Sequence, residues 1–318
     1  MAAVEFSMAI SGIPARRLDA PAGSVVITGG HGMIGASLVR SLSAADRSVR
    51  TIVRRPARDA TEIEWRPDSG YIDAPKLTGA DMVVHLAGEN IAQRWTPARR
   101  RRIRSSRSDA TRLLAAALAA LPTPPRVLVS ASAVGIYGDR GDEVLDESSA
   151  IGTGFLARIG AEWEAATEPA RAAGVRVVHM RLGVVLSPSG GILARMLTPF
   201  RLGIGGRLGS GRQWVSWIAL SDVLGAICHA LGDDTLTGPV NVCTPNPVTN
   251  AELTRILAGV LGRPAVFPVP ALALRAVFGD MANETILASQ RVRPSKLMER
   301  GFEFEWPTLE RALRGLLS

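Results

Sequence analysis

Short apolar runs alternate along this chain with longer segments whose apolar residues recur every three or four positions. The apolar runs predict buried strands at residues 25–27, 48–53, 81–87, 126–132 and 175–181. The helical spacing is found at residues 34–42, 97–120 and 154–173. Strands that alternate with helices in this way form right-handed crossovers, so the pattern predicts an α/β fold with a doubly wound parallel sheet of the Rossmann type.

The second half of the chain has a different texture, with glycine-rich loops, several tryptophans and shorter helices joined through prolines. We therefore predict a nucleotide-binding domain at 24–186 and a substrate-side region at 187–318. The latter includes a small, mostly helical C-terminal domain at about 265–318 and is partly interleaved with the sheet. Residues 1–23 show only a brief alternation of apolar positions, which fits a tail or an edge strand.

The first predicted strand runs directly into a glycine-rich turn. Gly30, Gly32 and Gly35 fit the pattern G-x-G-x-x-G, and Gly29 with the last two fits the wider T-G-x-x-G-x-x-G. Glycine permits a tight turn, lets the backbone approach a pyrophosphate, and lets helix and strand pack closely, while the helix N-terminus attracts the phosphates. A purely structural turn is the alternative. The predicted cofactor-binding residues of the turn are Thr28, Gly29, Gly30, His31, Gly32, Met33, Ile34 and Gly35.

The end of the second predicted strand indicates which nucleotide binds. Enzymes that use NAD usually place an acidic residue about 20 residues after the glycines, where it accepts hydrogen bonds from the ribose. This chain has Arg54 and Arg55 there. A guanidinium group pairs with a phosphate through two hydrogen bonds, so we expect NADP(H), with its 2′-phosphate, as the cofactor. A solvated basic loop is the alternative interpretation.

Composition favours a soluble enzyme. The chain has 318 residues, of which 47% are hydrophobic, enough for a large core. No apolar run reaches the roughly 18 residues of a membrane span, and the N-terminus lacks the layout of a signal peptide. Its two cysteines, Cys228 and Cys243, suit neither a disulfide framework nor a metal site. We therefore expect a cytoplasmic protein without a bound metal.

The net charge of +8 and the sequence pI of about 10.7 raise the question of nucleic acid. The densest basic stretch contains Arg99, Arg100, Arg101, Arg102, Arg104 and Arg107. Interleaved aromatic residues that could stack on bases are absent from it, so a solvated helix face is the favoured interpretation. An anionic substrate or cofactor could still use part of this field.

Several longer motifs carry a family resemblance. They are LAGENI (86–91), SASAVGIYG (130–138), GTGFLA (152–157), LGVVLSPSGG (182–191) and GIGGRLGSGRQWVSWI (203–218). With the glycine turn, they resemble the extended, epimerase-like branch of the short-chain dehydrogenase/reductases. Within that branch the chain is similar to the atypical "epimerase family" oxidoreductases. The resemblance covers about 24–317 and implies a Rossmann-type domain, NADP(H) binding and the small C-terminal domain peculiar to that family.

The chain departs from this superfamily at the position of its catalytic pair. Extended members use a Ser or Thr after the fifth strand and a Tyr-x-x-x-Lys pair on the next helix, where the lysine lowers the pKa of the phenol. Ser132 matches the first of these positions, with Ser130 as its neighbour. Phe155 and Ile159 stand where tyrosine and lysine are expected, and a shift by one residue also fails to restore the pair.

Tyr137 is the nearest phenol to Ser132, and we predict it as the candidate acid–base group. The alternative is that this loop tyrosine only packs or caps. Ser132 would hold the substrate oxygen in the favoured interpretation.

The remaining site predictions follow the carboxyl ends of the predicted strands. Those for the cofactor are Leu86, Ala87, Gly88, Ser130 and Arg181. Glu89 and Asn90 follow the fourth strand and are expected near the nicotinamide, and tryptophans beside arginine and glutamine suit a flat, anionic ligand. The predicted substrate residues are Glu89, Asn90, Arg94, Trp95, Arg212, Gln213 and Trp214.

Two functional hypotheses remain open at this point. The first is an NADP(H)-dependent oxidoreductase or epimerase-like enzyme that acts on a small carbonyl or hydroxyl compound without the usual dyad. The second is a catalytically silent NADP(H)-binding sensor or interaction protein. Neither requires nucleic acid or a membrane as partner. We expect a monomer or a homodimer, and the arginine run argues against a dimer through 97–120 and 153–173.

Overall fold

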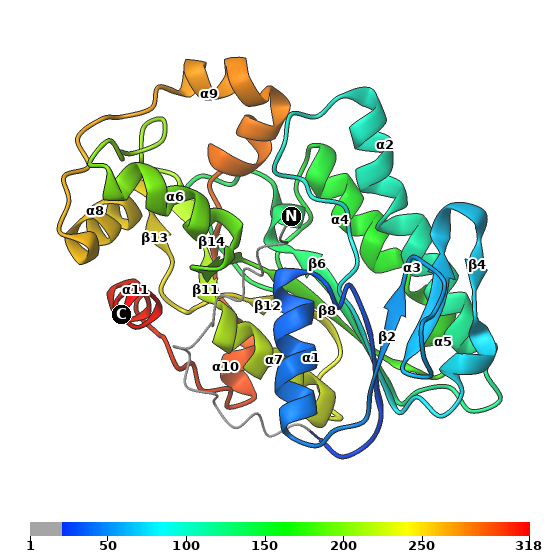
Figure 1. Ribbon diagram of the computed structural model, residues 1–318. Coiled ribbons are helices and arrows are strands. Elements are labelled where there is room, and N and C mark those ends of the chain that lie inside the picture. The colour runs from blue at the N-terminus through cyan, green and yellow to red at the C-terminus, as the bar shows by residue number, and fades with distance from the viewer. Residues whose placement is uncertain (1–20) are drawn as a thin grey trace, which may run out of the picture.

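The computed structural model describes residues 21–318, which contain one large twisted sheet between two helical layers (Figure 1). The strand order is β12-β8-β6-β5-β1-β2-β3-β4, and all neighbours are parallel except β3 and β4. In that order the strands are Gly238–Val242, Arg176–Leu182, Val127–Ala133, Met82–His85, Val25–Thr28, Val49–Val53, Glu62–Arg66 and Tyr71–Ile72.

Eleven α-helices occur within residues 21–318. From α1 to α11 they are Met33–Ala44, Pro97–Ser105, Ser108–Ala119, Phe155–Ala165, Glu168–Ala172, Gly191–Arg201, Leu220–Gly232, Asn250–Leu261, Ala271–Phe278, Ser295–Glu299 and Leu309–Leu317. No helix in this part of the chain has the length and apolar character needed to cross a membrane.

Short elements connect these larger ones. The strands outside the large sheet are β7 (Val144–Leu145), β9 (Val184–Ser187), β10 (Trp214–Val215), β11 (Trp217–Ala219), β13 (Val248–Thr249) and β14 (Arg291–Val292). Single helical turns are η1 (Pro67–Ser69), η2 (Ala74–Leu77), η3 (Val134–Tyr137) and η4 (Ala282–Ile286).

Alternating side chains of the central strands fill two separate cores. Val25 and Ile27 of β1 pack with α1 and α7 on one face, whereas Val26 packs with α3 and α5 on the other. Strands covered on both faces must be apolar at every position, which is why these segments are continuous hydrophobic runs in the sequence. The predicted α/β fold with a doubly wound sheet is confirmed.

Differences from the sequence prediction concern edges and helix ends. Strands β3, β4 and β12 were not predicted; β3 (EIEWR) alternates charged with apolar residues instead of forming an apolar run. The single helix expected at 97–120 is two helices, because the chain turns at Arg107 and directs that side chain inward. The helix expected at 154–173 is likewise divided, into α4 and α5. The prediction for residues 1–23 lies almost entirely outside the described residues.

The second half of the chain forms a lid on the carboxyl edge of the sheet and also contributes to the sheet. Helices α6, α8 and α11 share a third apolar core with Trp217, whereas β12 and α7 return to the Rossmann layers (Figure 1). Several polar contacts join the lid to the first half, among them those of Arg94, Arg100 and Glu284. Arg94 donates to the carbonyls of α9, Arg100 pairs with Asp280, and Glu284 accepts from the first N–H groups of α4.

The close packing of helix α1 on the turn after strand β1 depends on glycine at position 35. A Cβ atom at Gly35 would overlap the carbonyl oxygen of Gly29, a backbone atom that cannot rotate away. We therefore expect Gly35→Ala to lower the free energy of unfolding by about 2–4 kcal/mol in urea denaturation. Gly259→Ala is the matched control, since its Cβ would meet nothing within 4 Å in helix α8 and should be neutral or stabilising by up to about 1 kcal/mol. Equal effects of the two substitutions would contradict the packing.

Candidate functional site

A buried chain of hydrogen bonds joins the carboxyl ends of β1 and β5. Thr28 Oγ1 accepts from the N–H groups of Leu86 and Ala87 and lies 2.7 Å from Nδ1 of His85. Since Thr28 already accepts two hydrogen bonds, it donates its own proton to Nδ1. Nε2 of His85 therefore carries the ring proton and donates it to Thr111, 2.8 Å away. Thr28 thus fixes the backbone at the start of the loop after β5. Its side chain is fully buried and cannot contact a cofactor.

The glycine turn lies directly above this junction. Gly29 has a φ of +72°, and its Cβ would stand 2.8 Å from the carbonyl carbon of Leu86. Helix α1 begins at Met33 with no side-chain cap at Gly32 and no acidic residue in its first turn. The first N–H groups of a helix have no partner within it, so this N-terminus is free to bind an anion.

A cavity of about 610 Å³ opens beside the turn. It contains the predicted cofactor residues Gly29, His31, Gly32, Arg54, Leu86, Ala87 and Gly88, together with Glu89. The far wall of the cavity was not predicted from the sequence and consists of Ile52, Val53, Trp65, Pro67, Asp68, Arg102, Ser105, Ser106, Asp109 and Ala110. Trp65 belongs to the unpredicted strand β3 and Asp68 to the turn η1 that follows it, while Arg102 belongs to the arginine run that was interpreted as a solvated face.

The two arginines after β2 have different surroundings. Arg54 is exposed, lines the cavity and forms no ion pair within residues 21–318. Arg55 is held by both carboxylate oxygens of Glu62 on β3, at 2.5 and 2.6 Å. This hydrogen bond from Arg55 lowers the pKa of Glu62 to about 2, so the pair stays ionised. Arg54 therefore has a guanidinium group available for a phosphate, whereas that of Arg55 is bonded to Glu62 and holds the loop after β2 against β3.

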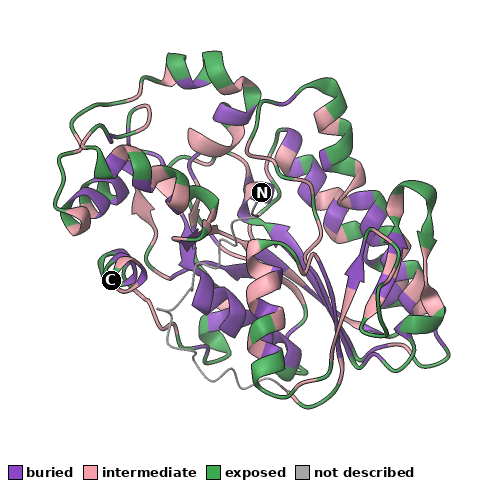
Figure 2. Ribbon diagram, in the orientation of Figure 1, coloured by how far each residue is buried: buried purple, intermediate pink, exposed green. Residues whose placement is uncertain are grey.

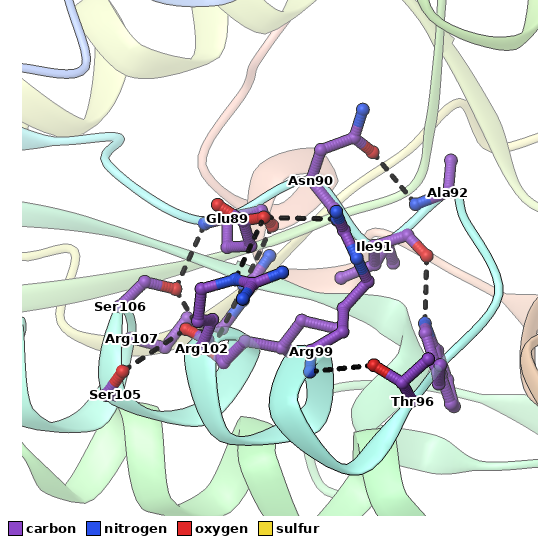
Figure 3. A network of polar contacts seen from close by, with 12 residues as sticks. Glu89, Asn90, Ile91, Ala92, Thr96, Arg99, Arg102, Ser105, Ser106 and Arg107 are labelled. Carbon is purple, nitrogen blue, oxygen red and sulfur yellow. Dashed lines mark hydrogen bonds and ion pairs between the residues drawn. The ribbon is translucent and has the colours of Figure 1, made fainter.

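Glu89 interacts with three arginines of the stretch that was predicted to be a solvated helix face (Figure 3). Arg99 donates to its carboxylate at 3.1 Å, and Arg102 lies 4.0 Å from the same oxygen. Arg107 turns inward, donates to the carbonyl of Glu89 at 3.0 Å, and stacks 4.9 Å from the ring centre of Trp163. Burial lowers the pKa of Arg107 to about 10, so it remains charged at neutral pH. The solvated-face interpretation is thus wrong for Arg107 and Arg99, while Arg101 is exposed as expected.

Ser132, the penultimate residue of β6, lies next to a buried ion pair. Its Oγ donates to Glu164 of α4 at 2.7 Å, and Glu164 accepts two further hydrogen bonds from Arg181, each of 2.8 Å. Burial by itself would raise the pKa of Glu164, but the Arg181 guanidinium outweighs it and the pKa is lowered. Ser132 is therefore the proton donor to a carboxylate that is ionised at neutral pH. Arg181, predicted to bind cofactor, is instead committed to this pair and is only 5% exposed.

Tyr137 does not have the placement of an acid–base group. It is fully buried, donates to Oδ1 of Asn241 at 2.8 Å and accepts from Arg181 at 2.9 Å. Burial raises the pKa of this phenol, although Arg181 partly offsets the rise. The packing role that was the alternative for Tyr137 fits this geometry, and direct contact with a substrate does not.

The positions of the missing dyad are occupied by packed apolar side chains. Phe155 is the first residue of α4, and its ring lies 5.1 Å from that of Trp95. Ile159 joins the same cluster, together with Met281 from the lid. Neither side chain can transfer a proton, so any proton transfer at this site requires other groups.

The predicted substrate residues do not form one group. Arg94 donates to a backbone carbonyl of α9, and Trp95 donates to the carbonyl of Ile91. The side-chain amide of Gln213 donates to the backbone carbonyls of Leu208 and Ile286. Trp214 donates to Asp142, while Arg212 and Asn90 are exposed. Ser130, predicted to bind cofactor, is 1% exposed and bonds within its own strand. Glu89 is the one predicted substrate residue that lines the cavity.

Comparison with known families agrees with this geometry. Residues 25–243 match the NAD dependent epimerase/dehydratase family, and residues 269–316 match a domain of unknown function, DUF1731. The chain belongs to the NAD dependent epimerase/dehydratase family, whose fold is that of the extended short-chain dehydrogenase/reductases.

Individual relatives align over nearly their whole length. "Epimerase family protein MT2273" of Mycobacterium tuberculosis is 47% identical over 91% of this chain and 96% of its own. "Epimerase family protein SDR39U1" of Homo sapiens is 36% identical over 92% of this chain and 99% of its own. The crystal structure of the human protein with NADPH superposes with a TM-score of 0.83 at 34% identity, covering 92% of this chain and 98% of that one.

The buried His85 makes stability depend on pH. Burial lowers its pKa to about 4 from an ordinary value of 6.5. Between these values the unfolded chain binds a proton that the folded chain does not. The free energy of unfolding should therefore be unaffected by His85 above pH 6.5 and fall by up to about 3 kcal/mol as the pH drops toward 4.

Urea denaturation at about pH 7 and about pH 5 measures this slope. His85→Gln should lose the part of the slope that His85 contributes, while His179 and His229, whose pKa values burial also lowers, keep theirs. His31→Gln, at an exposed position in the glycine turn, should retain the parent slope. An unchanged slope in His85→Gln would show that other groups cause the pH dependence.

Proposed function

We propose that this protein is an NADP(H)-dependent oxidoreductase or epimerase-like enzyme that acts on a small carbonyl or hydroxyl substrate without a Tyr-x-x-x-Lys dyad. The observation that carries the proposal is the glycine turn, which opens onto a cavity with Arg54 unpaired at its edge. The NADPH in the related human structure supports the choice of cofactor. The two cysteines, free and buried, are consistent with a reducing, cytoplasmic location.

The residues present fit the dinucleotide. A Cβ at Gly29 or Gly35 would overlap backbone atoms of Leu86 or Gly29, so glycine is what allows this tight turn, and the N-terminus of α1 that follows it would hold the pyrophosphate. Arg54 would bind the 2′-phosphate, and Arg102 stands in the same cavity as a second cation. When bound, the nicotinamide would supply or accept the hydride.

Substitution of Arg54 tests the cofactor assignment. Arg54→Ala removes a charge-assisted hydrogen bond of about 1.5–3 kcal/mol, so NADPH affinity should fall roughly ten- to a hundredfold while NADH affinity is unchanged. Arg55→Ala is the matched control, because Arg55 acts only through Glu62 and should have a smaller effect. Titration followed by nicotinamide fluorescence measures both. An equal loss of NADPH and NADH affinity in Arg54→Ala would contradict the assignment.

Ser132 and Glu164 offer a path for the proton. Since Ser132 donates its own proton to Glu164, its oxygen is left as an acceptor for a substrate hydroxyl. When that hydroxyl is oxidised, its proton would pass to Ser132 as the serine proton passes to Glu164. In the opposite direction the same path would return a proton to the oxygen. Arg181 keeps Glu164 oriented and ionised.

Turnover of the variants tests this path. A panel of aldehydes, ketones and sugar nucleotides, followed by loss of NADPH absorbance, would supply the substrate. Ser132→Ala and Glu164→Gln should each lower kcat by about 10²–10⁴-fold with NADPH affinity unchanged. Tyr137→Phe should stay within a few-fold of the parent kcat, although it should destabilise the fold by about 1–3 kcal/mol. A Tyr137→Phe protein without turnover but with parent stability would restore the tyrosine hypothesis.

A cofactor-binding protein without turnover is the second candidate. Three observations favour it: Ser132 is 1% exposed, Tyr137 is fully buried, and the dyad positions hold Phe155 and Ile159. This hypothesis expects tight NADPH binding, no consumption of NADPH with any member of the panel, and a partner whose affinity changes with the redox state of the cofactor. Turnover that depends on Ser132 would exclude it.

A further inference from the structure

The exposed apolar side chains of this protein are concentrated on the lid. Seven large apolar side chains are more than 55% exposed within residues 21–318, and six of them lie in two segments of the lid, the seventh being Val144. We call these six the α9 surface: Leu202, Ile204, Val266, Phe267, Leu272 and Val277, with exposures of 56–77%. Large exposed apolar groups that gather in one place mark an interaction site.

The two segments lie side by side. Phe267 donates its N–H to the carbonyl of Gly205, Val269 donates to Arg207, and Gly209 donates back to Val269. The strip that follows α6 therefore runs along the strip that precedes α9. In α9 itself only Leu274 is buried, whereas Leu272, Ala273, Ala276 and Val277 are exposed apolar residues next to these segments in the sequence. Most of the α9 ribbon is accordingly coloured as exposed (Figure 2).

The charge of this region is predominantly positive, although Glu252 and Asp280 directly flank its second stretch. Residues 191–213 and 253–279 contain seven arginines and neither aspartate nor glutamate. They are Arg195, Arg201, Arg207, Arg212, Arg255, Arg263 and Arg275, and none forms an ion pair with the described part of the chain. A cavity of about 490 Å³ beside the surface is lined by Arg207 and Arg255 together with Val266. Two unpaired guanidinium groups at an apolar edge fit a phosphate attached to an apolar body.

These features discriminate among partners. A second copy of this chain would bring the same arginines together in a two-fold contact, so like-charge repulsion opposes it. Nucleic acid would satisfy the arginines but requires stacking groups, and Phe267 is the one aromatic residue of the α9 surface. An anionic bilayer satisfies both features at once, because its interface accepts aliphatic side chains while its headgroups attract arginine.

We propose that the α9 surface binds peripherally to an anionic lipid membrane, with the six apolar side chains entering the interface and the arginines contacting headgroup phosphates. The protein does not span the bilayer in this arrangement. No membrane partner was expected from the sequence, which contains no apolar run long enough to span a bilayer. The exposed groups of the α9 surface come from two segments about 60 residues apart, which only the fold brings together.

Vesicle flotation tests the proposal. The full-length protein is mixed with vesicles of phosphatidylcholine alone or of phosphatidylcholine containing a third of phosphatidylglycerol, at low and high salt. We expect binding to the anionic vesicles only, weakened by salt. Val266→Ser/Phe267→Ser, Leu272→Ser/Val277→Ser and Arg201→Gln/Arg263→Gln should each lower the partition coefficient by about tenfold or more.

Matched controls carry the same chemical changes elsewhere. Val144→Ser/Ile151→Ser removes exposed apolar groups, and Arg101→Gln/Arg158→Gln removes exposed charges, at positions outside the α9 surface and its arginines. Both should bind as the parent does, and NADPH titration of each variant verifies its fold. Three results would overturn the proposal: no flotation of the parent with anionic vesicles at low salt, undiminished flotation of both apolar double variants, or a parent dimer that dissociates on Val266→Ser/Phe267→Ser. The last result would make the surface a subunit interface.

Discussion

The junction between β1 and β5 is the constraint on which the rest of the site depends. Thr28 can accept two backbone hydrogen bonds and still donate to His85 only if the imidazole is neutral, and burial keeps it so. This chain of bonds brings the carboxyl end of β5 against the glycine turn, where Gly29 leaves no room for a side chain. The turn, the α1 N-terminus and the start of the LAGENI loop therefore form one rigid wall of the cavity.

A second buried network holds the two halves of the chain together. Arg181 of β8 connects Glu164 of α4 with Tyr137, and Tyr137 continues to Asn241 of β12. Asn241 in turn donates to the carbonyl of Arg293, beside the short pairing of β14 with β7. Ser132, the proposed oxygen-binding residue, is thus oriented by an ion pair whose other contacts reach the C-terminal domain.

The central part of the fold could be predicted from the sequence because continuous apolar runs and a glycine turn are local signals. The edge strand β3 could not, since its alternating EIEWR has charges on its exposed side, and one of them, Glu62, fixes Arg55. The break at Arg107 escaped prediction for a similar reason. Its cause is tertiary, in that a guanidinium group stacks on Trp163 and bonds to the carbonyl of Glu89. Sequence spacing also placed Tyr137 correctly near Ser132 but could not tell that its hydroxyl is enclosed by Asn241 and Arg181.

The central claim is that the edge of the sheet above Thr28 and His85 binds NADP(H) in preference to NAD(H). Titration of the unmodified protein with NADPH and NADH, followed by nicotinamide fluorescence, tests it most directly. We predict saturable binding of NADPH, at least tenfold tighter than that of NADH, since one charge-assisted contact to the 2′-phosphate contributes about 1.5 kcal/mol or more. Absence of binding by either nucleotide would contradict the account and leave the glycine turn with a structural role only.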